Sequence, residues 1–360
     1  RIIQLSGRYF LEVLSDGHCN RAAIDMTPQD LGELNECFQR AIPSISRNNS
    51  QDNPSKQELA ELAKIGHIAF NKIFFNSDTR AYIRELTTLN ESASIQVVTE
   101  DFFLPWEFIY PDNLDEPHSF NNFWGMNHFL SRIIVQEKIS PAFVPPEIRF
   151  ADCAKLGLLT YRELLAVTEK ELQFFKKMED ESCLKLRILR CLNPDPNKWR
   201  EEFNEFRKFW LNGLDLVHFA CHAAYDKDSP SSSSILLSKE FSITLQDMDA
   251  YELEISGHPL IVMNACQTGK LNPLYTSCFA SFFQKYGARG VVATECEIPD
   301  TFAAEFTEQL YPHLFQGTPL GESLLATRRY FLNMHQNPAG LIYSMYASPS
   351  IRLVNIGSDL

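Results

Sequence analysis

The chain has 360 residues, of which 44% are hydrophobic and 12% aromatic, enough to bury the cores of two domains of ordinary size. This composition excludes a disordered or fibrous protein. The formal net charge of −13 is the wrong sign for a general nucleic-acid binder, and the longest apolar runs fall well short of the roughly 18 residues of a membrane-spanning helix. We therefore expect binding neither to nucleic acid nor to a membrane.

The first half of the chain is expected to be mainly helical. Helices are predicted from Thr27 to about Ala41 and from Ser55 to Phe75, and strands at Ser94–Thr99 and Arg132–Gln136. The segment Ser140–Pro146 contains three prolines and is the best candidate for a linker to the second half.

The second half alternates short apolar runs with longer amphipathic ones, a pattern typical of an α-β-α sandwich around a mostly parallel sheet. Predicted strands are Leu156–Thr160, Leu184–Cys191, Asp215–Cys221, Pro259–Ala265, Gly290–Thr294 and Ile351–Val354. Predicted helices are Glu163–Lys177, Lys198–Leu211, Leu274–Tyr286, Thr301–Leu314 and Leu320–Leu332.

The cysteines indicate a reducing compartment. Nine are present without a CxxC pair, and an odd number in a chain of this size does not suggest a disulfide framework. The same spacing argues against a structural zinc site. We therefore expect a cytoplasmic protein without a metal. The chain begins at Arg1 without a basic and then apolar leader, so we expect a processed chain or a fragment of a larger protein.

Two predicted strands end in reactive side chains, within the segments Leu-Val-His-Phe-Ala-Cys-His-Ala (216–223) and Ile-Val-Met-Asn-Ala-Cys-Gln-Thr-Gly (261–269). Sites in open parallel sheets form at the carboxyl ends of the strands, where His222 and Cys266 both fall. A cysteine thiolate attacks a carbonyl carbon, and a neighbouring imidazole accepts the thiol proton. The pair therefore predicts acyl transfer, with Cys266 as nucleophile and His222 as general base. The backbone N–H groups of Ala223 and Cys266 are the expected oxyanion donors.

The cysteine segment and its upstream histidine approximate the caspase signature, in which the histidine precedes the cysteine by about 50 residues. The chain more closely resembles the CHAT family of caspase-like peptidases, relatives of separase, which pair a His-Phe-Ala-x-His element (218–222) with an Ala-Cys-x-Thr-Gly element (265–269). Leu-Pro-Trp-Glu-Phe (104–108), Phe-Leu-Ser-Arg (129–132), Val-Val-Ala-Thr (291–294) and Asp300 are similar to the same family. One position departs: Ala223 stands where the family commonly has glycine, and a positive φ there would be strained.

This resemblance implies a caspase-type sheet and a Cys-His dyad that cleaves peptide bonds without a cofactor. We expect residues 146–360 to form the catalytic domain and residues 1–145 a degenerate caspase-like lobe without catalytic residues. The family also implies activation by a fused or bound sensor or repeat module and regulated cleavage of one partner protein, including in prokaryotic immunity. The alternative is a catalytically silent caspase-like module that binds a protein partner.

An acidic side chain near the dyad would select substrates with Arg or Lys before the scissile bond. Asp152, Glu295, Glu297 and Asp300 are the candidates. His218 and Cys221 are expected to be core residues, with Cys221 on the opposite face of the sheet from His222. Trp106 and Glu107 are expected to pack between the two halves, and the pair Arg328 and Arg329 to form a solvated helix face.

Overall fold

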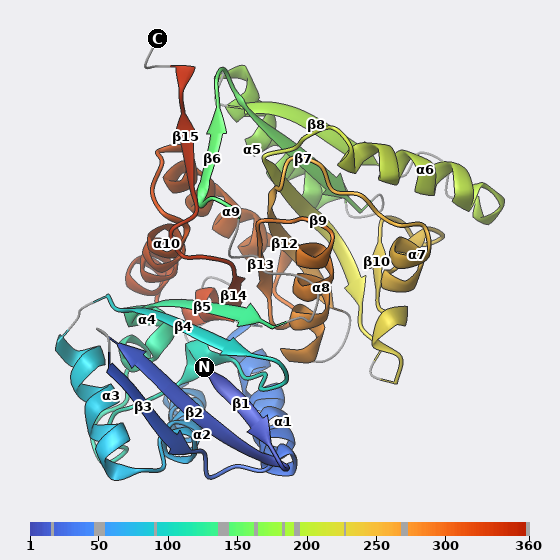
Figure 1. The fold of residues 1–360 in the computed structure, drawn as a ribbon. Coiled ribbons are helices and arrows are strands. Elements are labelled where there is room, and N and C mark those ends of the chain that lie inside the picture. Colours follow the sequence, from blue (N-terminus) through green and yellow to red (C-terminus); the bar gives the residue numbers. More distant parts are fainter. Residues whose placement is uncertain are drawn as a thin grey trace.

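The computed structural model describes residues 1–15, 18–46, 55–89, 92–135, 144–161, 165–181, 184–190, 195–226, 228–267 and 273–357. A mixed sheet of eight strands lies at the centre of this part of the chain (Figure 1). Its strands are β7 (Ala154–Thr160), β8 (Leu184–Arg190), β9 (Leu216–Ala224), β10 (Ser234–Leu236), β11 (Ser242–Thr244), β12 (Leu260–Gln267), β13 (Gly290–Thr294) and β14 (Tyr343–Tyr346).

The strands run in the order β8-β7-β9-β12-β13-β14, and the hairpin β10-β11 pairs with the last part of β9. The five strands from β8 to β13 are parallel to one another, whereas β10 and β14 are antiparallel to their neighbours. The predicted fold class, α/β with a mostly parallel central sheet, is confirmed.

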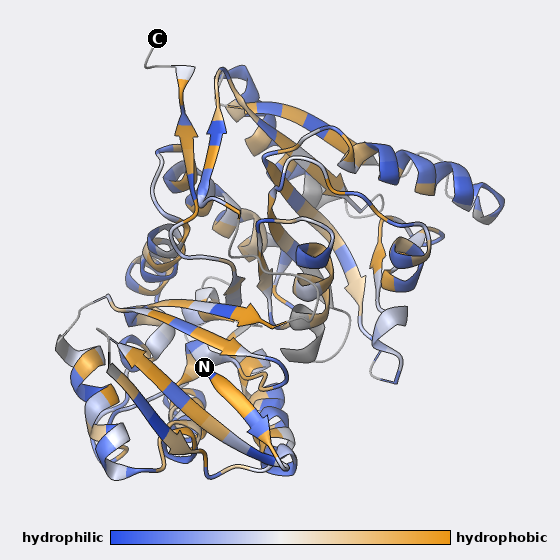
Figure 2. Ribbon diagram, viewed as in Figure 1, coloured by the Kyte–Doolittle hydropathy of each residue, from blue (hydrophilic) through white to orange (hydrophobic). Residues whose placement is uncertain are grey.

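Helices cover both faces of the central sheet (Figure 1). One face packs against α5 (Leu165–Asp180), α9 (Asp300–Phe315) and α10 (Leu320–His335), and the other against α6 (Trp199–Trp210), α7 (Leu245–Ala250) and α8 (Pro273–Lys285). Successive strand residues alternate between the two cores, as Leu216 and Val217 do in β9. The central strands are accordingly hydrophobic over most of their length, whereas the helices mix hydrophobic and hydrophilic residues (Figure 2).

The N-terminal half combines two small sheets with helices. Its antiparallel sheet is β1 (Ile2–Leu5), β2 (Arg8–Ser15) and β3 (His18–Ala23), its parallel pair is β4 (Ser94–Thr99) and β5 (Phe129–Ile134), and its helices are α1 (Pro28–Ser46), α2 (Lys56–Ile73), α3 (Ser77–Leu89) and the short α4 (Trp124–Asn127). The two predicted helices and two predicted strands are confirmed. The first three strands and α3 were not predicted.

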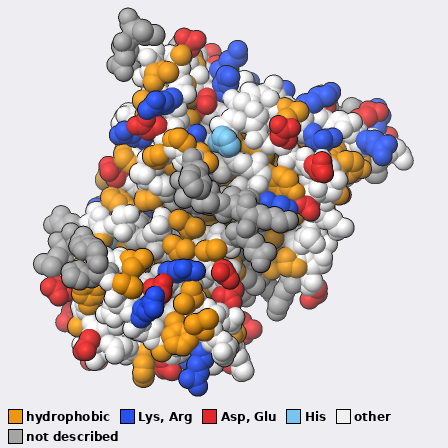
Figure 3. All heavy atoms as spheres, in the orientation of Figure 1, with side chains coloured by type: hydrophobic (Ala, Val, Ile, Leu, Met, Phe, Trp, Pro, Cys, Tyr) orange, Lys and Arg blue, Asp and Glu red, His pale blue; other side chains and the backbone are white. Residues whose placement is uncertain are grey.

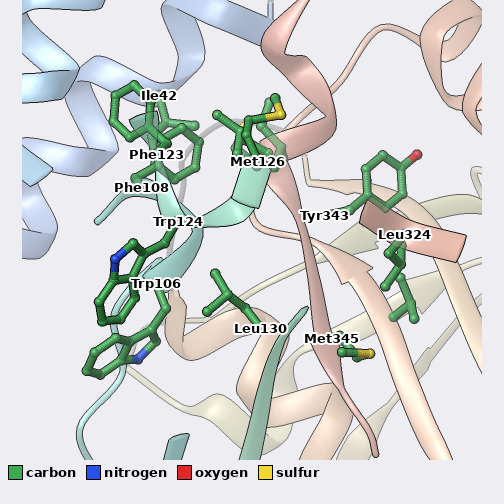
Figure 4. Packing of buried hydrophobic residues seen from close by; sticks show 14 of the residues in the cluster. Ile42, Trp106, Phe108, Phe123, Trp124, Met126, Leu130, Leu324, Tyr343 and Met345 are labelled. Atoms are coloured by element: carbon green, nitrogen blue, oxygen red, sulfur yellow. The ribbon is translucent and has the colours of Figure 1, made fainter. Parts of the chain in front are cut away.

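The two halves share one hydrophobic core, which runs from Ile2 in β1 to Leu353 near the C-terminal end. Strand β5 lies beside β14, so that the N-terminal half packs against the edge of the central sheet. Figure 4 shows residues from both halves together, with Phe123 and Trp124 from α4 and its approach, and Tyr343 and Met345 from β14. The division into a degenerate lobe and a catalytic domain stays a prediction, and residues 140–143 of the expected linker lie outside the described residues.

One predicted strand belongs to a different sheet. The segment expected at Ile351–Val354 forms β15 (Arg352–Asn355), which pairs in parallel with β6 (Glu147–Phe150) outside the central sheet. The edge of the central sheet beside β13 is formed by β14, which is antiparallel to β13. No helix among the described residues has the length and apolar character needed to cross a membrane. Acidic and basic side chains are interspersed on the face shown in Figure 3.

Candidate active site

Strands β9 and β12 are parallel neighbours, and their register places Cys266 directly opposite His222. The pairing begins at Leu260 with Leu216 and continues to Gln267 with Ala223. Both residues therefore stand at the carboxyl end of the sheet, where sites form in open parallel sheets. Because the register is set by the apolar faces of both strands, a slip of one residue would move each strand's core side chains to the wrong face. The remaining motif residues Thr268 and Gly269 lie outside the described residues.

The imidazole of His222 is partly exposed and lies against Tyr161, with ring centroids 4.6 Å apart in an edge-on arrangement. Its Nδ1 atom is buried and has no hydrogen-bond partner among the described residues. Tyr161 follows the end of β7, the other parallel neighbour of β9, and its backbone N–H donates to the carbonyl of Ala220. Sequence reasoning missed Tyr161, although its position directly after a strand at the same edge of the sheet was a usable signal.

Asp300 begins α9 and is half-buried. Burial raises the pKa of its carboxyl group, the nearby His222 lowers it and Glu171 raises it, with a net shift upward. This electrostatic coupling places Asp300 in the surroundings of His222. Glu297 is exposed in the segment between β13 and α9.

The structure places the other two acidic candidates elsewhere. Asp152 is exposed and precedes β7, so it lies at the amino end of the parallel strands, the opposite edge of the sheet from His222. Glu295 is 1% exposed, directly after β13, and its carboxylate pairs with Arg132 of β5. Neither side chain is available to a substrate bound at His222, so only Glu297 and Asp300 remain as candidates for the substrate pocket.

Glu295 belongs to a buried ionic cluster that joins the N-terminal half to the central sheet. Arg132 pairs with both Glu107 and Glu295 and donates to the Tyr346 hydroxyl at 2.8 Å. Burial raises the pKa of the Glu295 carboxyl, and the charge of Arg132 partly offsets that rise. Glu107 also lies 3.6 Å from Arg328, which is 2% exposed. The packing role expected for Glu107 is confirmed, whereas the solvated position expected for Arg328 is wrong, because its guanidinium donates to backbone carbonyls of Gly125, Gly340 and Tyr343.

His218 and Cys221 are core residues, as predicted. His218 is fully buried and its ring nitrogens lie 3.0 Å from the Tyr311 hydroxyl and 3.3 Å from the Glu171 carboxylate. Cys221 is 3% exposed and belongs to the core on the α6 and α8 face, whereas Ala220 belongs to the opposite core. By the strand's period of two, Cys221 therefore points away from the face of His222.

Ala223 adopts an ordinary strand conformation. The non-glycine residues with positive φ in the described part of the chain are Ser6, Glu252, His258 and Gln336. The alanine therefore carries none of the strain that a left-handed conformation would impose. It is fully buried, with Ile235 of β10 on one side and Gln267 of β12 on the other. The oxyanion role of the Ala223 and Cys266 amides stays a prediction.

Among the described residues, no group of three or more His, Cys, Asp or Glu side chains is arranged to hold a metal ion. What the described arrangement offers is a histidine opposite a cysteine at adjacent strand ends, with an aromatic ring and an acidic residue beside the histidine. The cysteine and the histidine are the two groups that acyl transfer through a thiolate requires.

Comparisons with known proteins show which family the chain resembles. The model of the CHAT domain family matches residues 112–350. A protein of Vitiosangium sp. (strain GDMCC 1.1324) described as a probable protease is 26% identical over 253 residues, which make up 66% of this chain and 31% of that protein. The chain thus spans less than a third of that relative's length. Among solved structures, the Saccharomyces cerevisiae separase–securin complex is similar, with a TM-score of 0.42 and 12% identity over 93% of this chain and 22% of that chain.

Proposed function

Because the match over residues 112–350 shows that this chain belongs to the CHAT domain family, we propose that it is a cysteine endopeptidase that cleaves a protein through Cys266 and His222. The observation that carries the proposal is the register of β9 and β12, which sets these two residues opposite each other at the carboxyl end of the sheet. The relative described as a probable protease supports the same reaction class.

In the proposed mechanism, the His222 imidazole accepts the proton of the Cys266 thiol, and the thiolate attacks the carbonyl carbon of the scissile peptide bond. The carbonyl oxygen becomes an oxyanion, for which the backbone amides of Ala223 and Cys266 are the proposed donors. As the carbon–nitrogen bond breaks, His222 returns its proton to the leaving amine. A water molecule then loses a proton to His222 and attacks the thioester, which releases the acid product and the free thiol.

The reactivity of Cys266 is the first test. Its reaction rate with iodoacetamide at pH 7, followed by mass spectrometry, is expected to exceed that of Cys278, because a thiol paired with an imidazole is partly thiolate near neutral pH. Burial raises the pKa of the Cys278 thiol to about 11, which makes it an unreactive internal reference. His222→Ala should bring the Cys266 rate down toward that of an ordinary thiol. A slow Cys266 in the wild type would instead favour the catalytically silent module that binds a protein partner.

We further propose that Asp300, with Glu297 at the edge of the same segment, selects Arg or Lys before the scissile bond. Asp300→Asn is then expected to lower kcat/KM for peptides with a basic residue at that position by about 10- to 100-fold, because the charged partner of the substrate is removed. Cleavage profiles of the wild type, Asp300→Asn and Glu297→Gln on one peptide library would measure this. The raised pKa of Asp300 adds a pH dependence: the preference for basic residues should fade as pH drops through a value above the ordinary aspartate range. Unchanged preference in both variants would rule out this pocket.

The peptidase is proposed to act in the cytoplasm on one partner protein and to be switched on by a fused or bound sensor module. This chain matches 31% of the length of the relative described as a probable protease, so most of that protein lies outside the matched region. A role in prokaryotic immunity is proposed on the same family grounds.

A further inference from the structure

A cluster of buried polar side chains lies below the dyad, between the central sheet and the helices on one face. All of its members are at most 5% exposed. They are Glu171 of α5, His218 of β9, Asn264 of β12, Thr307 and Tyr311 of α9, and Tyr343 of β14. Within the described residues, no Lys or Arg pairs with the Glu171 carboxylate. A carboxylate buried without a cation is unfavourable unless hydrogen bonds compensate it, so its place beside the catalytic strands requires an explanation.

Asn264 is held from three directions. Its amide nitrogen lies 2.7 Å from the Glu171 carboxylate, 2.8 Å from the Thr307 hydroxyl and 3.1 Å from the Ala303 carbonyl. Its amide oxygen accepts a hydrogen bond of 2.8 Å from the Tyr343 hydroxyl. The Asn264 amide is therefore fixed in one orientation by α5, α9 and β14 together.

Glu171 is the common acceptor of the cluster. Besides Asn264, its Oε1 atom receives the Thr307 hydroxyl at 3.2 Å and the Nε2 atom of His218 at 3.3 Å. With Nε2–H donating to the carboxylate, the Nδ1 atom of His218 accepts from the Tyr311 hydroxyl at 3.0 Å. One carboxylate oxygen thus links side chains of both strands that carry the dyad.

The hydrogen bonds of Glu171 meet the two strands a short distance before the dyad residues. Asn264 precedes Cys266 on β12 by one pleat repeat, and His218 precedes His222 on β9 by two. The two strands are paired at these levels as well, Val262 with His218 and Asn264 with Ala220. An apolar side chain in place of Glu171 would fill the space but would not fix the relative position of the two strands.

We propose that Glu171 is a positioning residue that aligns the ends of β9 and β12, and with them His222 and Cys266, through its hydrogen bonds to His218 and Asn264. The inference rests on the proposed function, because alignment matters only if the two residues exchange a proton. Glu171 itself does not touch the reacting atoms.

The test is the pH profile of Cys266 alkylation by iodoacetamide in folded protein, measured well below the unfolding temperature of each variant. Glu171→Leu, which keeps the volume and removes the acceptor, is expected to move the midpoint of the profile up toward the ordinary thiol value of about 8.5. Glu171→Gln retains a carbonyl acceptor and should keep the midpoint near that of the wild type. Tyr343→Phe removes the hydrogen bond to the Asn264 oxygen but keeps the ring that stacks on Phe306. It should shift the midpoint in the same direction as Glu171→Leu, but by less. This variant replaces Glu171→Leu in the test if Glu171→Leu does not fold.

Phe206→Leu is the matched control, since Phe206 is fully buried in the core on the other face of the sheet. It should lower the unfolding temperature and leave the profile in place, because loss of stability alone does not change the pKa of a folded dyad. A wild type with a depressed midpoint, together with Glu171→Leu and Tyr343→Phe midpoints equal to it, would overturn this proposal and leave the proposed function intact. A Glu171→Gln midpoint shifted as far as that of Glu171→Leu would also overturn it. A wild-type midpoint at the ordinary thiol value would overturn both.

Discussion

Replacing Cys266 with alanine is expected to lower the rate of peptide cleavage by at least about 10⁴-fold, the scale found when a nucleophile that acts as a unit with its base is removed. The reason is that the remaining groups bind and polarise the substrate but cannot form the covalent intermediate. His222→Ala should lower the cleavage rate by a factor of the same order. The double variant should be little slower than either single variant, because the two residues act in one step. Initial rates on a peptide that the wild type cleaves, taken from a library screen, measure these effects.

Cys278→Ala is the matched control for the nucleophile. Cys278 is a free thiol on α8, and the pKa of about 11 that burial gives it leaves almost no thiolate at neutral pH. Its replacement should leave the cleavage rate unchanged. If Cys278→Ala lost as much activity as Cys266→Ala, the assignment of the nucleophile would be wrong.

Replacing Arg132 with methionine is expected to lower the free energy of unfolding by about 3–5 kcal/mol, the usual cost of removing one partner from a buried ion pair. The guanidinium lies between the carboxylates of Glu107 and Glu295, and each of those side chains is about 1% exposed. Without it, two carboxylates would be left facing each other with only the more distant Arg328 nearby. Urea unfolding, compared at equal m-value, measures the loss.

Arg149→Met provides the comparison, because Arg149 also pairs with a glutamate, Glu147, but on the surface of β6. Exposed pairs contribute little to stability, so its unfolding midpoint should remain at that of the wild type. Equal midpoints for Arg132→Met and the wild type would mean that the cluster does not hold the two halves together. Glu295 lies in the segment that connects β13 to α9, where Asp300 stands. Loss of the ion pair between Arg132 and Glu295 should therefore displace this segment and also weaken cleavage.

The sequence predicted the central sheet well, because parallel strands buried on both faces appear as near-continuous apolar runs. The strand at Gly290–Thr294 was predicted with its observed bounds, and the strand expected at Pro259–Ala265 extends to Gln267. The short β10, β11 and β14 were missed, since three or four residues give too little periodicity to detect. Helix α3 was missed because its polar and β-branched residues, among them Thr87 and Thr88, favour a helix only weakly.

For the site, the sequence placed His222 and Cys266 at the carboxyl ends of two strands, because a strand's end can be located from its apolar run, and the structure shows that these strands are neighbours. It did not predict which charged residues are buried. Glu295 and Arg328 are buried by partners far away in the chain: Arg132 is 163 residues from Glu295, and Gly125 is 203 residues from Arg328. A local sequence pattern does not indicate such distant pairs. A charged residue is therefore predicted to be exposed unless its partner in the tertiary structure is known. The hydrogen bonds of Glu171 to Asn264 and His218 escaped prediction for the same reason.

The most direct test of the central claim is to incubate wild-type and Cys266→Ala protein with a proteome-derived peptide library, with and without lysate of the native host, and to identify new termini by mass spectrometry. The account predicts a set of cuts made by the wild type alone, with Arg or Lys before the cleaved bond. The same cuts in both proteins, or no cuts in either together with a Cys266 alkylation rate as slow as that of Cys278, would contradict a peptidase that acts through Cys266.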